Sequence, residues 1–495
     1  MSGLDLHVDL APGTGRRAAL EQALRAAVRE GRLAPHTRLP STRELAVELE
    51  LSRGTISAAY DQLIAEGYLV ARHGSGTVVA QLPLPAAAAA ARDAGGATRT
   101  PATLADPADP AQALAEEVVT QPRFDLRPGR PDVSSFPVGA WVSATRKALA
   151  RAPMAAYGYG DPRGRIELRT ALADYLGRTR GVVAPPERSV ITSGAGQALA
   201  LLADVVRDAG GAVFAMEDPG LTFHREVIRR RGLGVVPLPV DEEGARTATL
   251  LSGRLPASAV VLTPAHQYPT GVVLNPERRR LVVDWASRGG GIVVEDDYDG
   301  EFRYDRQSVG ALQGTAPEQV VYLGTASKTL APGLRLAWLV LPARLVEPIV
   351  EAKRCMDLQT GSISQLTLAE LVTGHAYDRH VRMCRQRYRR RRNLLMDRLA
   401  PALEAGYVVH GIAAGLHGLV DLPRHGPTEE EVLTETAAHG LALGQMTTHW
   451  FDPVGRPQGL VIGFGTPGES SYPAALDTLI RSLRTLHRRP PAELG

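Results

Sequence analysis

The sequence has few of the features that mark secreted and membrane proteins. It contains only two cysteines in 495 residues, Cys355 and Cys384, which excludes a disulfide framework and a cysteine zinc site. No stretch reaches the roughly 18 consecutive apolar residues of a membrane span. Residues 1–9 lack the basic start and the apolar core of a signal peptide. These absences predict a protein of the reducing cytoplasm with no membrane association.

Lysine is scarce among the charged residues. Of 56 basic residues only three are lysines, namely Lys147, Lys328 and Lys353. A codon bias toward arginine, alanine, glycine and proline explains most of this shortage. The primary amine of lysine can bond covalently to an aldehyde, whereas the permanently charged guanidinium of arginine cannot. A lysine that persists under such a bias is therefore a candidate for a position that needs an amine.

Composition divides the chain into three parts. Residues 1–80 show helical patterns, and residues 81–122 are rich in alanine and proline with few large apolar side chains. That stretch buries too little surface to offset its ordering entropy, so we predict a linker, with room for a short helix around 111–118. Residues 123–490 alternate helical segments with β-rich runs, which indicates a mostly parallel α/β sheet. The runs are 189–192, 212–216, 259–263, 291–295, 320–323 and 338–341.

The first 80 residues follow the order helix, break, helix and hairpin. Residues 18–30 place their apolar side chains on one helical face. Ser41 or Thr42 can cap a second helix, and a third is predicted from residue 53 to 65. Two β stretches, 69–71 and 77–79, then flank a glycine-containing turn. This order predicts a winged helix-turn-helix domain.

The string "RLPSTRELAVELELSRGTISAAYDQLIAEGYLVARHGSGTVV" resembles the GntR family of bacterial regulators. The resemblance implies that the helix over 53–65 enters the major groove of double-stranded operator DNA, with the wing tip beside the minor groove. Arginine suits phosphates and guanine, while hydroxyls and main-chain amides suit phosphates. By position, the resemblance assigns DNA contacts to Arg43, Arg53, Gly54, Thr55, Ser57, His73 and Gly74.

The net charge of this domain gives no sign of DNA binding. Residues 1–80 contain nine arginines and nine acidic residues, so the formal balance is 9 − 9 = 0. A surface that attracts DNA must therefore come from the arrangement of the charges, with acidic side chains turned away from the recognition helix.

In the third part, polar residues follow two apolar runs. Lys328 comes shortly after the run 320–323, and Glu295-Asp296-Asp297-Tyr298 closes the run that begins at 291. Ligands of open α/β sheets bind at the carboxyl ends of the strands. Carboxylates placed there are costly to bury unless a cation or a ligand contacts them. We therefore expect a binding site at this edge of the sheet.

The strings "YGYGDPRG", "HQYPTG", "EDDYDGEFRYD" and "GTASKTLAPGLRLAW" together resemble the fold-type I, aminotransferase-like proteins that bind pyridoxal phosphate (PLP). Joined to a GntR domain, they resemble the MocR subfamily from about residue 14 to 485, the linker excepted. The resemblance implies that Lys328 bonds covalently to the cofactor aldehyde. Asp296, with Asp297 as the alternative, would pair with the pyridine nitrogen, and Tyr298 with the ring oxygen. It assigns the phosphate to Arg335, Thr325 and Ser327.

The resemblance also implies a second phosphate element at Ala195 and Gly196, where a helix begins. Tyr159 matches a tyrosine that the neighbouring subunit donates to the phosphate, which would make the protein a homodimer. His266 opens "HQYPTG" near the ring oxygen, and a packed loop histidine is the alternative. The arginine-rich run 385–392 is predicted to be a solvated helix or a subunit contact in preference to a nucleic-acid site.

Two positions depart from the family pattern. The place of an aromatic residue that stacks on the cofactor ring is taken by Leu221, with Phe223 as a substitute. Val461 stands where relatives that bind amino acids carry an arginine for the substrate carboxylate. Arg225 is a second candidate for binding that carboxylate on an effector.

The resemblance implies a PLP-binding transcriptional regulator whose aminotransferase-like domain is a sensor and not an enzyme. Because of Val461, we expect PLP itself to be the effector, as in PdxR-like members that control vitamin B6 synthesis. An amino-acid effector is the alternative. An active aminotransferase and a regulator without PLP are the rival interpretations. Lys147 and Lys353 are expected on ordinary helical segments with no ligand nearby.

Overall fold

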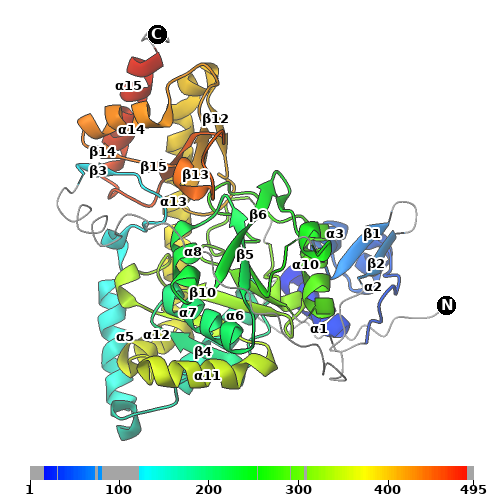
Figure 1. Ribbon diagram of the computed structural model, residues 1–495. Helices are drawn as coiled ribbons and strands as arrows, with labels where there is room; N and C mark the ends of the chain where they lie inside the picture. The colour runs from blue at the N-terminus through cyan, green and yellow to red at the C-terminus, as the bar shows by residue number, and fades with distance from the viewer. Residues whose placement is uncertain are drawn as a thin grey trace.

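The computed structural model describes residues 16–29, 32–72, 76–80, 122–253, 255–289, 291–305 and 309–487. It shows a small N-terminal domain beside a central sheet domain, with a third layer formed by the C-terminal residues (Figure 1). Most of the predicted linker, the short helix near 111–118, and His73 and Gly74 lie outside the described residues. Among the described helices, none combines the length and apolar character that crossing a membrane requires.

The N-terminal domain is a winged helix-turn-helix, as predicted. Its elements are α1 (Arg16–Arg29), α2 (Thr42–Glu48), α3 (Arg53–Ala65), β1 (Leu69–Arg72) and β2 (Gly76–Val79). The side chain of Ser41 caps α2 and forms a reciprocal capping box with Glu44, and Ser52 caps α3. Apolar side chains of all three helices and both strands close one core, among them Leu24, Leu45 and Ile56. β1 and β2 pair antiparallel to form the wing.

The central domain is built on an eight-stranded sheet in the order β4-β11-β10-β9-β8-β5-β6-β7. Five adjacent strands, from β10 to β6, are parallel, whereas β11 runs antiparallel to both of its neighbours. All six predicted β-rich runs lie in this sheet. The strands are β4 (Ser189–Thr192), β5 (Val213–Asp218), β6 (Gly234–Asp241), β7 (Gly244–Ala245), β8 (Ala259–Leu262), β9 (Ile292–Asp296), β10 (Val320–Thr325) and β11 (Ala337–Val340).

Helices cover both faces of the sheet because its strands are apolar on both sides. On one face Val190, Val294 and Val321 pack against α7 (Ala195–Asp208) and α11 (Ala343–Asp357). On the other face the strands pack in two clusters, to which three helices contribute most of the helical side chains. These are α6 (Ile166–Arg180), α12 (Ser362–Thr373) and α10 (Pro276–Gly289).

The chain leaves this domain through the long helix α13 (Ala376–Glu404) and enters the C-terminal layer. There a four-stranded sheet in the order β12-β13-β16-β15 packs with two further helices. A short pair, β14 with β3, brings residue 124 beside residue 441. The remaining elements are α5 (Val138–Arg151), α8 (Thr222–Arg229), α9 (Ala248–Leu251), α14 (Glu429–Ala438), α15 (Tyr472–His487), β3 (Phe124–Asp125), β12 (Val408–His410), β13 (His417–Asp421), β14 (Leu441–Ala442), β15 (Gly444–Gln445) and β16 (Gly459–Gly463).

Candidate cofactor site and DNA-binding surface

A cavity of about 380 Å³ opens where β9 and β10 end and α7 begins. This is the edge of the sheet at which the sequence predicts a ligand. Most of the predicted cofactor residues line it, although they come from four separate stretches of the chain. The predicted residues in its wall are Ala195, Gly196, Asp296, Tyr298, Thr325, Ser327, Lys328 and Arg335.

Lys328 lies three residues beyond the end of β10, and its amine reaches into this cavity. Its Nζ donates a hydrogen bond to the main-chain oxygen of Gly129 at 2.5 Å. Burial lowers the pKa of the Lys328 amine, although Asp296 and Asp299 oppose that shift. A lower pKa increases the unprotonated fraction, which is the form that attacks an aldehyde.

The structure separates the two candidate aspartates. Asp296 lines the cavity, with one carboxylate oxygen 3.6 Å from His224 Nδ1. Asp297 turns away, accepts two hydrogen bonds from Arg180 at 2.7 and 2.8 Å, and accepts one from the Tyr322 hydroxyl. Burial, followed by repulsion from Asp297, raises the pKa of Asp296 to about 8. A protonated ring nitrogen in the cavity would supply the positive charge that this buried carboxylate lacks.

The phosphate end of the cavity is formed by a turn, a helix start and an arginine. Gly194 has φ +106°, and a Cβ on it would come within 2.5 Å of the Arg335 guanidinium. Only glycine lets the main chain approach that closely. Arg335 also donates to the main-chain oxygen of Ser193 at 2.6 Å. Ala195 opens α7 and lines the cavity with Gly196, so the amides of the two residues are available to an anion at the helix start.

The hydroxyls of Thr325 and Ser327 complete this end, with their oxygens 3.0 Å apart. The Ser327 amide also donates to Thr325 Oγ1, which fixes the turn after β10. Together with the amine and the acid opposite it, this set of donors matches PLP in chemistry and in size. PLP is therefore the cofactor that these residues fit.

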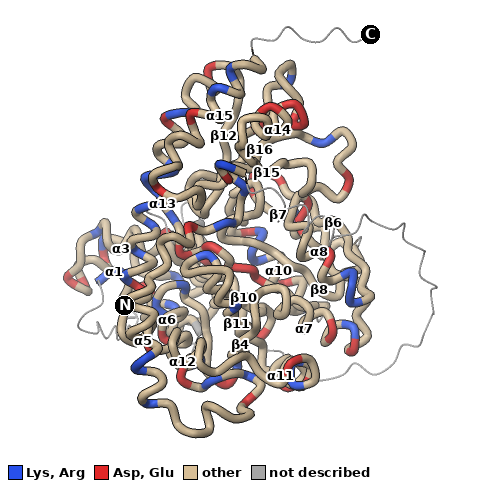
Figure 2. The backbone as a smooth tube through the Cα atoms, turned by 90° about the vertical axis from the view of Figure 1, so that its left-hand side faces the viewer, with Lys and Arg blue, Asp and Glu red and all other residues tan. Residues whose placement is uncertain are grey.

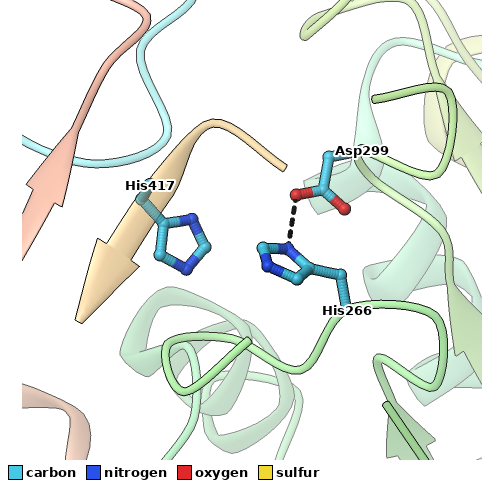
Figure 3. Close-up of side chains that lie close together, drawn as sticks. All are labelled: His266, Asp299 and His417. Carbon is cyan, nitrogen blue, oxygen red and sulfur yellow. Dashed lines mark hydrogen bonds and ion pairs between the residues drawn. The ribbon is translucent and has the colours of Figure 1, made fainter. Parts of the chain in front are cut away.

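His266 lies behind Tyr298 and does not line the cavity. Figure 3 shows its ring between Asp299 and His417. Its Nδ1 is 2.8 Å from Asp299 and 3.2 Å from the Tyr298 hydroxyl, and its Nε2 is 3.0 Å from the main-chain oxygen of Gly411. The histidine thus reaches the ring-oxygen region through the hydroxyl of Tyr298.

The side chains of His266, Asp299 and His417 lie close together and have the composition of a metal site. The two ring nitrogens of His266 have a carboxylate and a carbonyl as hydrogen-bond partners, so both nitrogens are engaged within the protein. Burial alone would lower the pKa of His266, but Asp299 and the Gly411 carbonyl raise it overall. His417 Nε2 donates to the Pro269 oxygen at 3.2 Å. We interpret the group as an ion pair and hydrogen-bond network.

Two buried titratable residues of the cavity were missed by the sequence reasoning. His224 faces Asp296, and burial lowers the pKa of its ring to about 4, so it is neutral. Burial raises the pKa of Glu217 to about 7, and its carboxylate accepts from the Thr263 hydroxyl at 2.5 Å. Both residues belong to the string "EDPGLTFHR", which spans the end of β5 and the start of α8. Leu221 and Phe223 of that string, the two candidates for packing on the cofactor ring, both line the cavity.

The predicted DNA contacts that fall on described residues lie at the surface of the winged domain. Arg43, Arg53 and Gly54 are exposed, and Thr55 and Ser57 are partly exposed on α3. Two acidic residues of this domain, Glu21 and Glu66, are buried on another side, where both pair with Arg25. For these two residues the structure has the separation of charges that a neutral DNA-binding domain requires.

Comparisons with known proteins agree with both halves of the molecule. Residues 16–79 match the model of the family "Bacterial regulatory proteins, gntR family", and residues 124–440 match "Aminotransferase class I and II". A pyridoxine biosynthesis transcriptional regulator, PdxR of Corynebacterium glutamicum, is 30% identical over 94% of this chain and 96% of its own. The probable rhizopine catabolism regulatory protein MocR of Rhizobium meliloti is 31% identical over 90% of this chain and 89% of its own. The chain belongs to the MocR-type GntR regulators.

A solved structure supports the fold of the larger part of this MocR-type chain. Pyrococcus horikoshii kynurenine aminotransferase, whose crystal structure contains PMP, has a TM-score of 0.67 at 24% identity. The similarity covers 77% of this chain and 95% of the aminotransferase. At this identity it shows that the two proteins share a fold.

Arg225 of this MocR-type chain does not line the cavity. Its Nη2 donates to the main-chain oxygens of Glu217 and His449 at 3.1 and 2.6 Å, and its guanidinium lies 3.9 Å from the centre of the Phe451 ring. Val461 is fully buried in β16. Neither position therefore brings a free guanidinium to the cavity in this structure.

Tyr159 also lies away from the cavity and is 88% exposed. It belongs to an exposed segment with several large apolar side chains nearby in the sequence, on α5 and on the turn that follows. These are Val138, Val142, Leu149, Met154 and Tyr157. Such a surface resembles one that a second subunit covers.

Lys353 lies on the helix α11, as expected, but its burial was not predicted. Its side chain is fully buried, and Nζ donates to both oxygens of Asp357 and to the Thr360 hydroxyl at 2.8–3.0 Å. Gln197 on α7 donates to Asp357 at 2.7 Å and accepts from the Ser193 amide at 2.7 Å. The amine therefore supports the turn that carries the phosphate-binding amides. Lys147 is exposed on α5.

The arginine-rich run lies on α13, along which basic residues recur (Figure 2). Several of these arginines bind other parts of the chain. Arg391 is buried and pairs with Asp132 at 3.0 Å, and Arg385 donates to the main-chain oxygen of Glu301 at 2.8 Å. Others, such as Arg389, are exposed. The run thus holds the long helix against its neighbours and presents a solvated face elsewhere.

Proposed function

We propose that this chain is a transcriptional regulator that binds operator DNA through its winged domain and PLP in its large domain, with PLP itself as the effector. The observation that supports this proposal is that the cavity has the groups needed to bind PLP but lacks, at the two predicted positions, an arginine for an amino-acid carboxylate. Groups suited to the aldehyde, the ring nitrogen and the phosphate line it, whereas Arg225 and Val461 offer no carboxylate-binding guanidinium. As a DNA-binding regulator, the protein would act in the cytoplasm.

When bound, PLP supplies an aldehyde that reacts with a primary amine and a ring nitrogen that can carry a proton. Lys328 would provide the amine, and Asp296 would hold the proton on that nitrogen. Tyr298, positioned by His266 and Asp299, would donate to the ring oxygen. Arg335, Thr325, Ser327 and the amides at the start of α7 would bind the phosphate.

The site would be completed by a second subunit. Tyr159 does not line the cavity of its own subunit, and the exposed apolar side chains near it in the sequence suit a twofold contact. In a homodimer, Tyr159 of each subunit would reach the phosphate in the other. Two winged domains would then read two half-sites of an operator.

A titration on the DNA upstream of the chain's own coding sequence tests the proposal. The dissociation constant for this fragment is measured with and without PLP, for the wild type and for Lys328→Ala. We expect PLP to change the wild-type constant and to leave that of the variant unchanged. If PLP has no effect on the wild type and an amino acid does, the effector is an amino acid.

A separate stopped-flow assay with a panel of amino acids tests the enzymatic alternative. Rapid conversion of bound PLP to its amine form would show an active aminotransferase. We expect conversion to be slow because neither Arg225 nor Val461 offers a guanidinium to a substrate carboxylate.

A further inference from the structure

The winged domain rests on a buried loop of the central domain, residues 309–316. Every residue of this loop is buried, although it forms no regular structure beyond one short turn. Tyr68, which follows α3, is 1% exposed and donates its hydroxyl proton to the main-chain oxygen of Gly314. In Figure 1 the winged domain accordingly lies beside α10, the helix next to this loop in space.

Glu66, at the C-terminal end of α3, makes the second contact with this loop. A Cβ placed on Gly310 would come within 2.5 Å of the carboxyl carbon of Glu66. The main chain at Gly310 and the Glu66 side chain are therefore in direct contact, with no space for a side chain at position 310. Arg25 from α1 holds the carboxylate through two bonds of 2.6 Å. The C-terminal end of the recognition helix α3 therefore lies against the loop, and α1 is connected to this contact through Arg25.

The opposite side of the loop is attached to the cofactor strand. Glu295 on β9 accepts the amides of Leu312 and Gln313 at 2.7 and 2.8 Å. Arg180, which binds Asp297, donates to the main-chain oxygen of Val309 at 2.9 Å. Residues on both sides of Asp296 in the sequence are thus bound, directly or through one arginine, to the loop under the winged domain.

This arrangement follows from the periodicity of a strand, in which successive side chains point to opposite faces. Asp296 faces the cavity, and Glu295 and Asp297 face the loop. A displacement of the main chain at Asp296 therefore moves both neighbours in the same rigid segment. Packed interiors transmit such displacements because they have little room to absorb them.

We propose that loop 309–316 is the surface through which occupancy of the cofactor cavity controls the seating of the winged domain, by way of Glu295 and Asp297 on one side and Glu66 and Tyr68 on the other. This proposal rests on the proposed function. It predicts a coupling between two ligands, which is reciprocal: if PLP changes the affinity for DNA, DNA changes the affinity for PLP by the same factor.

The test is the ratio of PLP dissociation constants without and with the operator fragment. For the wild type we expect a ratio that departs from one by about 5-fold or more. Tyr68→Phe removes the hydrogen bond to Gly314 and keeps the aromatic ring, and Gly310→Ala places a methyl group against Glu66. Both variants should bring the ratio to within about twofold of one, with PLP affinity in the absence of DNA unchanged within about twofold.

Two matched controls exist in the chain. Tyr60→Phe removes an equally buried phenol hydrogen bond, to the Pro40 oxygen inside the winged domain, at 2.9 Å. Gly289→Ala adds a methyl group at a glycine with nothing within 4 Å. Both should keep the wild-type ratio.

A wild-type ratio of one would overturn the proposed effector and this proposal together. A wild-type ratio preserved in Tyr68→Phe and Gly310→Ala would overturn this proposal alone.

Discussion

The cofactor cavity and the predicted DNA-binding surface differ in how far their charged side chains are exposed to solvent. In the cavity, Lys328 and Asp296 are buried beside other charged groups, and burial shifts the pKa of each. On the winged domain, Arg43 and Arg53 are exposed. The polar groups of the cavity are therefore fixed by the packing around them, whereas the predicted DNA-binding arginines extend into solvent. Substitutions in and behind the cavity should change PLP binding or the free energy of unfolding. Substitutions on the exposed surface should change only the affinity for DNA.

The largest effect is expected for Lys328→Ala, because no other side chain in the cavity carries a primary amine. The purified variant should lose the visible absorbance band of covalently bound PLP completely. Lys147→Ala, which changes an exposed lysine on α5, should keep that band. Absorbance spectra of both variants with added PLP check this, and a band that survives in Lys328→Ala would assign the covalent bond elsewhere.

Arg53→Ala tests the surface side of the comparison. Loss of an arginine contact to DNA costs about 1–3 kcal/mol, so operator affinity should fall about 5- to 150-fold. The free energy of unfolding, measured by thermal denaturation, should change by less than about 0.5 kcal/mol because the Arg53 side chain is exposed. Arg207→Ala, an exposed arginine on α7, serves as the control in the same DNA titration. A large loss of stability in Arg53→Ala would contradict the distinction between the two regions.

Lys353→Met probes the buried support behind the phosphate turn. The variant leaves Asp357 partly buried without its ammonium partner, so the free energy of unfolding should fall by about 1–3 kcal/mol. Because Asp357 also holds Gln197, PLP affinity should weaken about tenfold. Chemical denaturation and PLP titration measure the two quantities, with Lys147→Met as the control. Unchanged PLP affinity would limit Lys353 to a role in stability.

Asp296→Asn should have opposite effects with and without the cofactor. In the cofactor-free protein the pKa of Asp296 is raised from 3.8 to about 8, so folding retains a proton that the unfolded chain releases. The share of stability due to Asp296 is therefore present below about pH 4 and lost as the pH rises toward 8. The asparagine variant should lack this share of the decline and be more stable at pH 8 by more than about 1 kcal/mol.

The same variant should bind PLP more weakly, because asparagine cannot hold a proton on the ring nitrogen by charge. Denaturation at pH 5 and pH 8 and a PLP titration separate the two effects. Asp297→Asn, which breaks the pair with Arg180, should instead destabilise the protein at pH 8. If both variants behave alike, the assignment of the two aspartates to opposite faces is wrong.

The fold could be predicted from the sequence because its signals are local. The apolar runs 189–192 and 320–323 are bounded by turns, and the caps at Ser41 and Ser52 precede the helices of the winged domain. The antiparallel course of β11 was not predicted, since a short apolar run carries no information on its direction.

The site was predicted less completely because it depends on distant contacts. Asp296 and Asp297 are adjacent in the sequence, and they are distinguished by contacts with distant residues, such as Arg180 more than 100 residues earlier. Lys353 resembled an ordinary helical lysine because its partners lie on α7 and after α11 as well as on its own helix. Arg225 had the right chemistry for an anion, but Phe451 and two carbonyl groups from other segments surround it.

The contact between Gly310 and Glu66 has a practical consequence for exchanging domains between relatives. A chimera that joins the winged domain of one MocR-type protein to the large domain of another brings together two surfaces that did not evolve as a pair. Any side chain at position 310 would collide with a glutamate at position 66. The natural boundary for such an exchange is therefore not the linker alone, and residues 309–316 should be transplanted with the DNA-binding module.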